Sequence, residues 1–301
     1  MLRLIYTSFV LMLCSQTATA VTAYAVADDN FDLPDHLVEI DLETGQFVSK
    51  GQLADPYIAI EGLAISENGV LYGADDNTKT LVQINVNEGR AFAVANANQN
   101  FGFGAIPDSY DFGMSFSCNN NLYLVVKHTQ ELYQVDPTTG AAELIGNTQH
   151  SFTSLASWGD ELYAVASGDF NLYQIDPATA QATVVGSMGD LGGDINLTGS
   201  GLSFDDQGQL WMIVNLRLSD PLNPFPSRIF KLDHQTGQAQ LISETLVGVE
   251  SLAIAPPGGC DVVIGPGGSA VAVPTNSQWA LMTLLLSLLA VGGLAIRNKH
   301  I

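Results

Sequence analysis

The sequence predicts an all-β protein: a five-bladed β-propeller with N-/C-terminal blade closure, framed by an N-terminal signal peptide and a C-terminal transmembrane helix. Two observations predict the propeller. Short apolar segments bounded by turn residues fill the middle of the 301-residue chain, and they recur in similar units of roughly 47 residues. Units of four short strands at about this period are typical of propeller blades. A β-sandwich also consists of short strands, but its strands lack this self-similarity.

The clearest repeat is a strand that ends in a tight turn. The chain reads LYQVDPTTG at 132–140 and LYQIDPATA at 172–180. The Asp caps its own turn through its side chain, and the Gly four residues later supplies a left-handed backbone position. The turn residues of the five copies are Asp41 and Gly45, Asn85 and Gly89, Asp136 and Gly140, Asp176 and Ala180, and Asp233 and Gly237. We therefore expect Ala180 to occupy a left-handed position that the other copies give to glycine.

Two further columns of short segments define the order of the strands. The first-strand column opens with Gly or Ser and reads GLAIS, GMSFS, SLASW, GLSFD and SLAIA. The second-strand column reads AYAV, LYGA, LYLVV, LYAVA and LWMIV, and its aromatic residues are expected to pack between blades. The repeats begin with a second strand and end with a first strand. We therefore predict that 251–255 and 21–51 complete one blade together, which leaves no open sheet edge at the seam.

This repeat pattern resembles the broad YVTN or quinoprotein-like propeller superfamily. It resembles more closely the secreted bacterial repeat domains of unknown function that carry LYxIDPxTG units. The resemblance covers about 235 residues of the chain. It implies the propeller fold and no particular activity, because one fold hosts many functions.

The N-terminal segment MLRLIYTSFVLMLCSQTATA has the features of a secretory signal peptide. A basic Arg3 precedes an apolar run, and Ala18 and Ala20 have the A-x-A spacing of a cleavage site. We expect cleavage after Ala20. The predicted organisation is a signal peptide at 1–20, a propeller ectodomain at 21–260, a Gly/Pro/Ser linker with a sorting motif at 261–278, and a transmembrane helix with a basic cytoplasmic end at 279–301.

The segment VPTNSQWAL at 273–281 resembles the IPTL-CTERM sorting signal of Gram-negative envelope proteins. The matching residues are Pro274, Thr275, Ser277 and Trp279, and an uncharged run with a basic end follows them. The resemblance implies recognition and cleavage by an exosortase-type sorting protease, and an ectodomain that is periplasmic or at the cell surface. A plain inner-membrane anchor is the alternative, because an apolar helix of this length can span a bilayer.

The ectodomain is strongly acidic. Between the signal peptide and the transmembrane helix, 31 Asp and Glu residues face only seven Lys and Arg, which gives a formal charge of −24. Nucleic acid and anionic lipid surfaces are therefore poor partners for the ectodomain. No serine-hydrolase, zinc-protease or phosphate-loop motif occurs, so we expect a non-catalytic protein. Cys118 and Cys260 remain after processing, and an exported protein can join such a pair as a disulfide.

The connections of variable length all fall on one face of the predicted propeller. The most irregular are 97–112, 187–200 and 217–228. Insertions confined to one face of a repeat fold usually mark its binding surface, so we expect this face to bind a protein, glycan or matrix partner. Drift of unconstrained loops on an unused surface would produce the same pattern.

Three carboxylates come close before the Gly or Ser column at this face: Glu61 and Glu250 directly precede it, and Asp111 lies one place earlier. Like charges gathered in a concave site raise their own pKa values unless a cation joins them. IEGLAI at 60–65 also resembles calcium-dependent lactonase-like propellers, in which a Glu before the inner strand is a metal ligand. That resemblance implies a Ca²⁺ site and, as the alternative function, a metal-dependent hydrolase acting at the channel mouth. The Asn and Asp ligands expected from the other blades have no clear match, and solvated carboxylates are the other interpretation.

Overall fold

A computed structural model describes residues 20–28, 30, 32–94, 101–103, 111–192, 196–217 and 225–260. The predicted signal peptide before Ala20, and the sorting motif and transmembrane helix after Cys260, lie outside these ranges. Within the ranges, no helix combines the length and the hydropathy that a membrane span requires.

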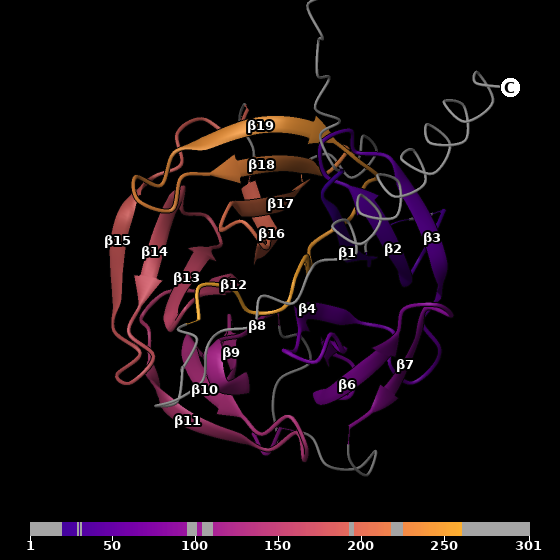
Figure 1. Ribbon diagram of the computed structural model, residues 1–301, viewed down its shortest axis with the longest axis horizontal. Coiled ribbons are helices and arrows are strands. Elements are labelled where there is room, and N and C mark those ends of the chain that lie inside the picture. The colour runs from indigo at the N-terminus through magenta and orange to yellow at the C-terminus, as the bar shows by residue number, and fades with distance from the viewer. Residues whose placement is uncertain are drawn as a thin grey trace, which may run out of the picture. The chain divides into compact units, whose positions relative to one another are not determined.

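In the described residues, nineteen strands form five antiparallel sheets around one axis, so the protein is a five-bladed β-propeller (Figure 1). In each blade the strands follow chain order from the axis outward, which confirms the predicted repeat. Blade 1 contains β1 (Thr22–Ala27), β2 (His36–Asp41) and β3 (Phe47–Gln52); blade 2 contains β4 (Ile60–Ile65), β5 (Leu71–Asp75), β6 (Thr80–Asn85) and β7 (Arg90–Ala93); blade 3 contains β8 (Phe112–Phe116), β9 (Leu122–Val126), β10 (Glu131–Val135) and β11 (Ala142–Asn147); blade 4 contains β12 (Phe152–Trp158), β13 (Glu161–Ala166), β14 (Asn171–Ile175) and β15 (Ala182–Ser187); blade 5 contains β16 (Asn196–Phe204), β17 (Leu210–Arg217), β18 (Arg228–Leu232) and β19 (Ala239–Glu244).

Blade 1 is completed by a closing segment, residues 249–253, that comes from the other end of the propeller sequence. The backbone N–H of Tyr24 donates to the carbonyl of Ala253 at 2.8 Å, and the N–H of Ala253 donates back at 2.9 Å. A second bridge pairs Ala27 with Val249. Between these bridges, the backbone N–H of Val26 donates to the hydroxyl of Ser251 at 3.0 Å. The predicted closure of the ring is therefore confirmed.

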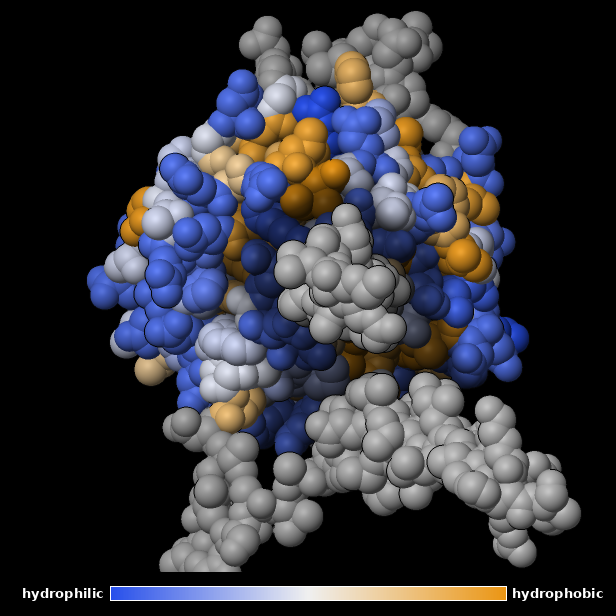
Figure 2. Space-filling view, turned by 45° about the horizontal axis from the view of Figure 1, so that its top comes forward, coloured by the Kyte–Doolittle hydropathy of each residue, from blue (hydrophilic) through white to orange (hydrophobic). Residues whose placement is uncertain are grey.

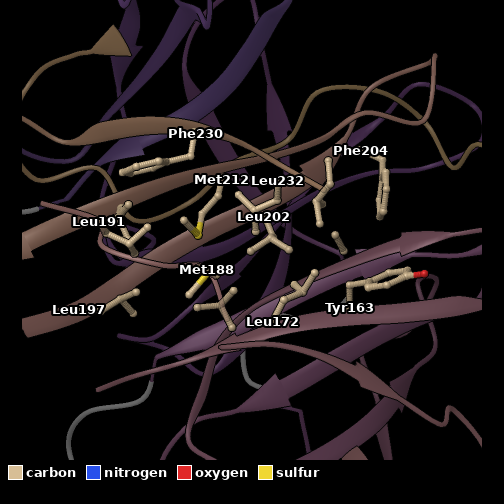
Figure 3. Packing of buried hydrophobic residues seen from close by; sticks show 14 residues of the cluster. Tyr163, Leu172, Met188, Leu191, Leu197, Leu202, Phe204, Met212, Phe230 and Leu232 are labelled. Carbon is tan, nitrogen blue, oxygen red and sulfur yellow. The ribbon is translucent and has the colours of Figure 1, made fainter. Parts of the chain in front are cut away.

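The hydrophobic core consists of five clusters, each of which lies between two neighbouring blades. Between blades 4 and 5, Tyr163 and Leu172 on one side meet Leu202, Met212 and Phe230 on the other (Figure 3). A blade therefore buries its apolar faces only when it has a neighbour on each side.

The Gly or Ser that opens each segment of the first-strand column is explained by crowding at the axis. A Cβ atom on Gly113 would lie 2.7 Å from the Cα atom of Ser154 in blade 4. A Cβ atom on Gly201 would lie 2.5 Å from the backbone nitrogen of Leu252 in the closing segment. Neighbouring inner strands thus approach too closely to leave room for a larger side chain.

The Asp–Gly turns follow the predicted geometry. The four turn glycines have positive φ, and Ala180 has a φ of 61°, so the predicted left-handed alanine is confirmed. The Ala180 methyl group is buried beside Gly146 of blade 3, where a Cβ atom would lie only 3.1 Å from the methyl carbon. The small residue in the neighbouring blade makes room for the alanine.

We predict that two glycine substitutions in these turns differ in cost. Both Gly140→Ala and Gly237→Ala place a side chain at positive φ, which costs about 1–2 kcal/mol. The new Cβ atom at 140 would lie 3.4 Å from the Leu81 Cβ atom, whereas the one at 237 would lie 2.4 Å from the carbonyl oxygen of Gly186. Chemical denaturation should therefore show a larger loss of unfolding free energy for Gly237→Ala. Equal losses would show that the blades do not approach as closely as the structure indicates.

Candidate functional site

The two faces of the propeller carry different kinds of connection. The turn face carries the Asp–Gly turns and the hairpins that join first to second strands. The loop face carries the connections between second and third strands and those between successive blades. Its connections vary in length, from Ala166–Asn171 between β13 and β14 to Ala93–Phe112 between β7 and β8. Parts of the three irregular segments singled out in the sequence lie outside the described residues.

The axial channel is nearly filled by side chains. The cavity at its centre has a volume of about 10 Å³, which is room for about one water molecule. Its lining includes the residues that follow the Gly or Ser of each segment of the first-strand column: Leu63, Met114, Leu155, Leu202 and Leu252. A substrate cannot enter this channel, so a ligand that binds on the axis must do so at one of its ends.

The hydroxyl groups beside the channel are committed to hydrogen bonds between inner strands. The Thr153 and Ser200 hydroxyl oxygens lie 2.7 Å apart, and those of Ser154 and Ser200 lie 2.9 Å apart. All three residues are buried. Their arrangement ties blade 4 to blade 5 and favours a structural role over that of a nucleophile.

Five carboxylates gather at the loop-face end of the axis. We call this group the acidic mouth; it consists of Asp28, Glu61, Asp76, Asp111 and Glu250. The Glu61 side chain is partly buried, and it lines the axial cavity. Its burial, together with the charges of Glu250, Asp28, Asp111 and Asp76, raises the pKa of Glu61 well above the usual range.

Three polar partners reduce the charge repulsion around the acidic mouth. Lys127 forms an ion pair with Asp111, and the Lys79 ammonium lies 2.5 Å from an Asp76 carboxylate oxygen. The Asn215 amide donates to the Glu250 carboxylate at 2.5 Å. Among the described residues, no donor is hydrogen-bonded to the carboxyl group of Glu61.

The structure places the three predicted metal ligands in one electrostatic neighbourhood, but it does not arrange them as a ready metal site. In the described ranges, no three Asp, Glu, His or Cys side chains lie where they could hold one ion together. Asp111 and Glu250 are instead engaged by Lys127 and Asn215. A cation shared by Glu61, Glu250 and Asp111 would first have to displace these partners.

Asp28 and Asp76 also belong to the acidic mouth, but they were not predicted from the sequence. Their positions in the repeat could have indicated them. Each follows directly on a second-strand segment, AYAVA or LYGAD, and so emerges on the same face as the inner-strand starts. The pairing of second strands with inner strands brings them to the axis.

A C-terminal strap, residues 256–260, crosses the turn-face end of the ring (Figure 1). The Gly159 N–H donates to the carbonyl of Gly258 at 2.8 Å, and a Cβ atom on Gly258 would lie 2.4 Å from the Trp158 ring. The strap ends in a disulfide between Cys260 and Cys118, whose Cα atoms lie 5.5 Å apart. Cys118 begins the 3₁₀ turn η1 (Cys118–Asn120) just after β8. The strap therefore links blade 1 covalently to blade 3.

A groove of about 790 Å³ on the turn face lies between blades 5 and 1. The Lys231 ammonium lies 4.5 Å from the centroid of the Trp211 ring and 2.7 Å from a Glu43 carboxylate oxygen. The Trp211 indole N–H donates to Asp205 at 2.9 Å. These side chains hold one another across the seam of the ring, which is a structural role.

The rest of the surface matches the acidic composition. Hydrophilic side chains cover most of the face in Figure 2, and hydrophobic patches interrupt them. Exposed large apolar residues lie on outer strands, for example Val48, Leu144 and Val184.

Comparison with known proteins supports the fold and leaves the activity open. The sequence profile of a family described as "Repeat of unknown function (DUF6923)" matches residues 15–144. No curated protein sequence matches the chain significantly.

Among solved structures, a protein of unknown function from Bacteroides caccae superimposes with a TM-score of 0.51 at 11% identity, over 78% of this chain and 98% of that one. A virginiamycin B lyase from Staphylococcus aureus gives a TM-score of 0.43 at 12% identity, over 75% of this chain and 71% of that one. A protein of unknown function from Bacteroides thetaiotaomicron gives 0.41 at 16% identity, over 59% of this chain and only 53% of that one. At these identities the likeness concerns the fold alone.

We predict that Glu61→Gln stabilises the protein in a pH-dependent way. The folded-state pKa of Glu61 lies above the value of about 4.3 for an unfolded Glu, so the stability of the folded state falls as the pH rises through the folded-state pKa. Glutamine removes that loss. The Tm of the variant should exceed that of the wild type by at least about 2 °C at about pH 8, and the difference should vanish towards about pH 4.

The matched control is Glu67→Gln, because Glu67 is exposed just beyond the other end of β4. It should leave the pH dependence of the Tm unchanged. A lower Tm for Glu61→Gln at about pH 8 would show that the Glu61 carboxylate is compensated by a partner and does not destabilise the fold.

Proposed function

We propose that the chain is an exported, non-catalytic binding protein whose loop face takes a positively charged group of a protein, glycan or matrix partner at the acidic mouth. The observation that carries the proposal concerns Glu61, whose carboxyl group is partly buried beside four other carboxylates. Among the described residues, none donates a hydrogen bond to the Glu61 carboxyl group. An ammonium or guanidinium group would supply both the missing donors and the opposite charge.

The shape of the ring supports binding at this end of the axis. The channel centre holds about one water molecule, and the strap crosses the turn-face end. A side chain or a sugar amine from a partner can therefore reach the acidic mouth only from the loop face. This is the face on which loop insertions occur, as in other repeat proteins that bind partners.

The export part of the proposal rests on the features of residues 1–20 and on the sorting motif Pro274, Thr275, Ser277 and Trp279. In this scheme the C-terminal helix holds the protein in the inner membrane until an exosortase-type protease processes the tail. The disulfide between Cys118 and Cys260 supports export, because disulfides persist in oxidising compartments.

Binding can be tested with short fluorescent peptides that contain one lysine or arginine, compared with acetyl-lysine and citrulline versions. We expect Glu61→Gln/Glu250→Gln to weaken binding of the charged peptides at least tenfold. The control Glu67→Gln/Asp206→Asn removes the same number of charges from exposed residues on the turn face and should bind as the wild type does. Equal losses in both variants, or equal binding of the uncharged peptides, would contradict the proposal.

The alternative function, a metal-dependent hydrolase of lactonase-like type, requires a bound cation. Our proposal predicts that millimolar calcium leaves the Tm of chelator-treated protein unchanged, because Asp111 and Glu250 already have protein partners. A calcium-dependent rise in the wild-type Tm that Glu61→Gln abolishes would support the calcium site, and the hydrolase, instead.

A further inference from the structure

The closing segment is held by fewer backbone pairs than the inner strands of the other blades. It makes two bridges to β1, at Tyr24–Ala253 and Ala27–Val249. By comparison, β8 forms five residue pairs with β9, and β16 forms eight with β17. Between the two bridges, the backbone N–H of Val26 donates to the Ser251 hydroxyl instead of to a backbone carbonyl. The seam of the ring is therefore the place where local opening costs the fewest hydrogen bonds.

The strap that follows the closing segment offsets this weakness. Its glycines 258 and 259 lie against the Trp158 ring, and its last residue is bonded to Cys118 in blade 3. The disulfide spans 142 residues of sequence, which include β9 to β11 of blade 3 and all strands of blades 4 and 5. Because Cys260 cannot leave blade 3, the closing segment is tethered at a point only a few residues beyond its last bridge.

The two sulfur atoms differ in access. Cys118 is buried, with 7% of its surface exposed, whereas Cys260 is exposed. A reductant in solution can therefore approach the disulfide from the Cys260 side while the folded blades stay in place.

From this geometry we propose that the Cys118–Cys260 disulfide is a redox-sensitive clasp on the ring seam. When it is oxidised, the strap lies over Trp158 and the closing segment stays paired with β1. When it is reduced, the strap leaves Trp158, and residues 249–255 open transiently from blade 1 more often while blades 2 to 4 keep their structure. The clasp is independent of the binding function proposed above.

The reduction needs a dithiol as its partner. One thiolate of the dithiol attacks the exposed sulfur of Cys260, which breaks the bond to Cys118 and releases the Cys118 thiolate. The second thiol of the dithiol then attacks the mixed disulfide, releases the Cys260 thiolate and leaves the dithiol as a disulfide. Two electrons pass to the protein, and the two thiolates take up protons from water.

Hydrogen exchange on the full chain, below its melting temperature, tests the clasp. On reduction with a dithiol, we expect exchange of the Tyr24, Val26 and Ala253 amides to accelerate at least tenfold. The amides of β12 to β14 should keep their rates, and the fluorescence of Trp158 should shift to the red as the strap leaves its ring. Cys118→Ser/Cys260→Ser should exchange in this way without reductant, and adding the dithiol should change nothing further.

Three results would overturn the clasp. Exchange at the seam that does not respond to reduction would show that the closing segment needs no tether. A uniform acceleration in all blades would show global destabilisation in place of local opening. Two free thiols in protein recovered from an oxidising compartment would show that the bond does not form. If the double variant does not fold, reduction of the folded wild type gives the same comparison.

Discussion

The ring stays closed because Tyr24 and Ala253 exchange a pair of backbone hydrogen bonds between segments that lie far apart in sequence. Each hydrophobic cluster lies between two blades, so an opening at the seam would expose the apolar faces of blades 1 and 5 to water. Closure affects blades 2, 3 and 4 through the blades that pack beside them. The Ser251 hydroxyl and the strap to Cys118 therefore stabilise the pairing between β1 and the closing segment, on which the closed ring depends.

Crowding at the axis has a second consequence, which concerns function. The inner strands approach closely enough to require Gly113 and Gly201, and they leave a cavity of only about 10 Å³ in the channel. Side chains that come just before the Gly or Ser positions find room only at the loop-face end. Glu61 and Glu250 occupy such positions, which explains how a filled channel comes to have a charged opening.

Much of the fold could be predicted because a propeller repeats its local chemistry along the chain. The Asp–Gly turns, the Gly/Ser column and the start on a second strand are all visible in the sequence, and even the left-handed Ala180 follows from its column. A repeat shows which residues are equivalent. It does not show which side chains meet across blades.

The site was therefore predicted only in part. The sequence indicates Glu61, Glu250 and Asp111, but not Asp28 and Asp76, which reach the axis through strand pairing. The partners Lys127 and Asn215, which occupy two of the three carboxylates, were not predicted either, because each comes from another strand. The path of the strap depends on contacts of Trp158 with Gly258 and Gly259, which are distant in sequence. No local sequence pattern predicts such contacts.

The central claim is that residues 249–260 are part of the cooperative unit and not an appendage to it. The most direct measurement compares the thermal unfolding of a chain that ends after Cys260 with that of a chain that ends after Gly248. We expect a cooperative transition for the first and none for the second, because the shorter chain lacks the inner strand of blade 1. A soluble shorter chain that melts cooperatively at a similar temperature would contradict it.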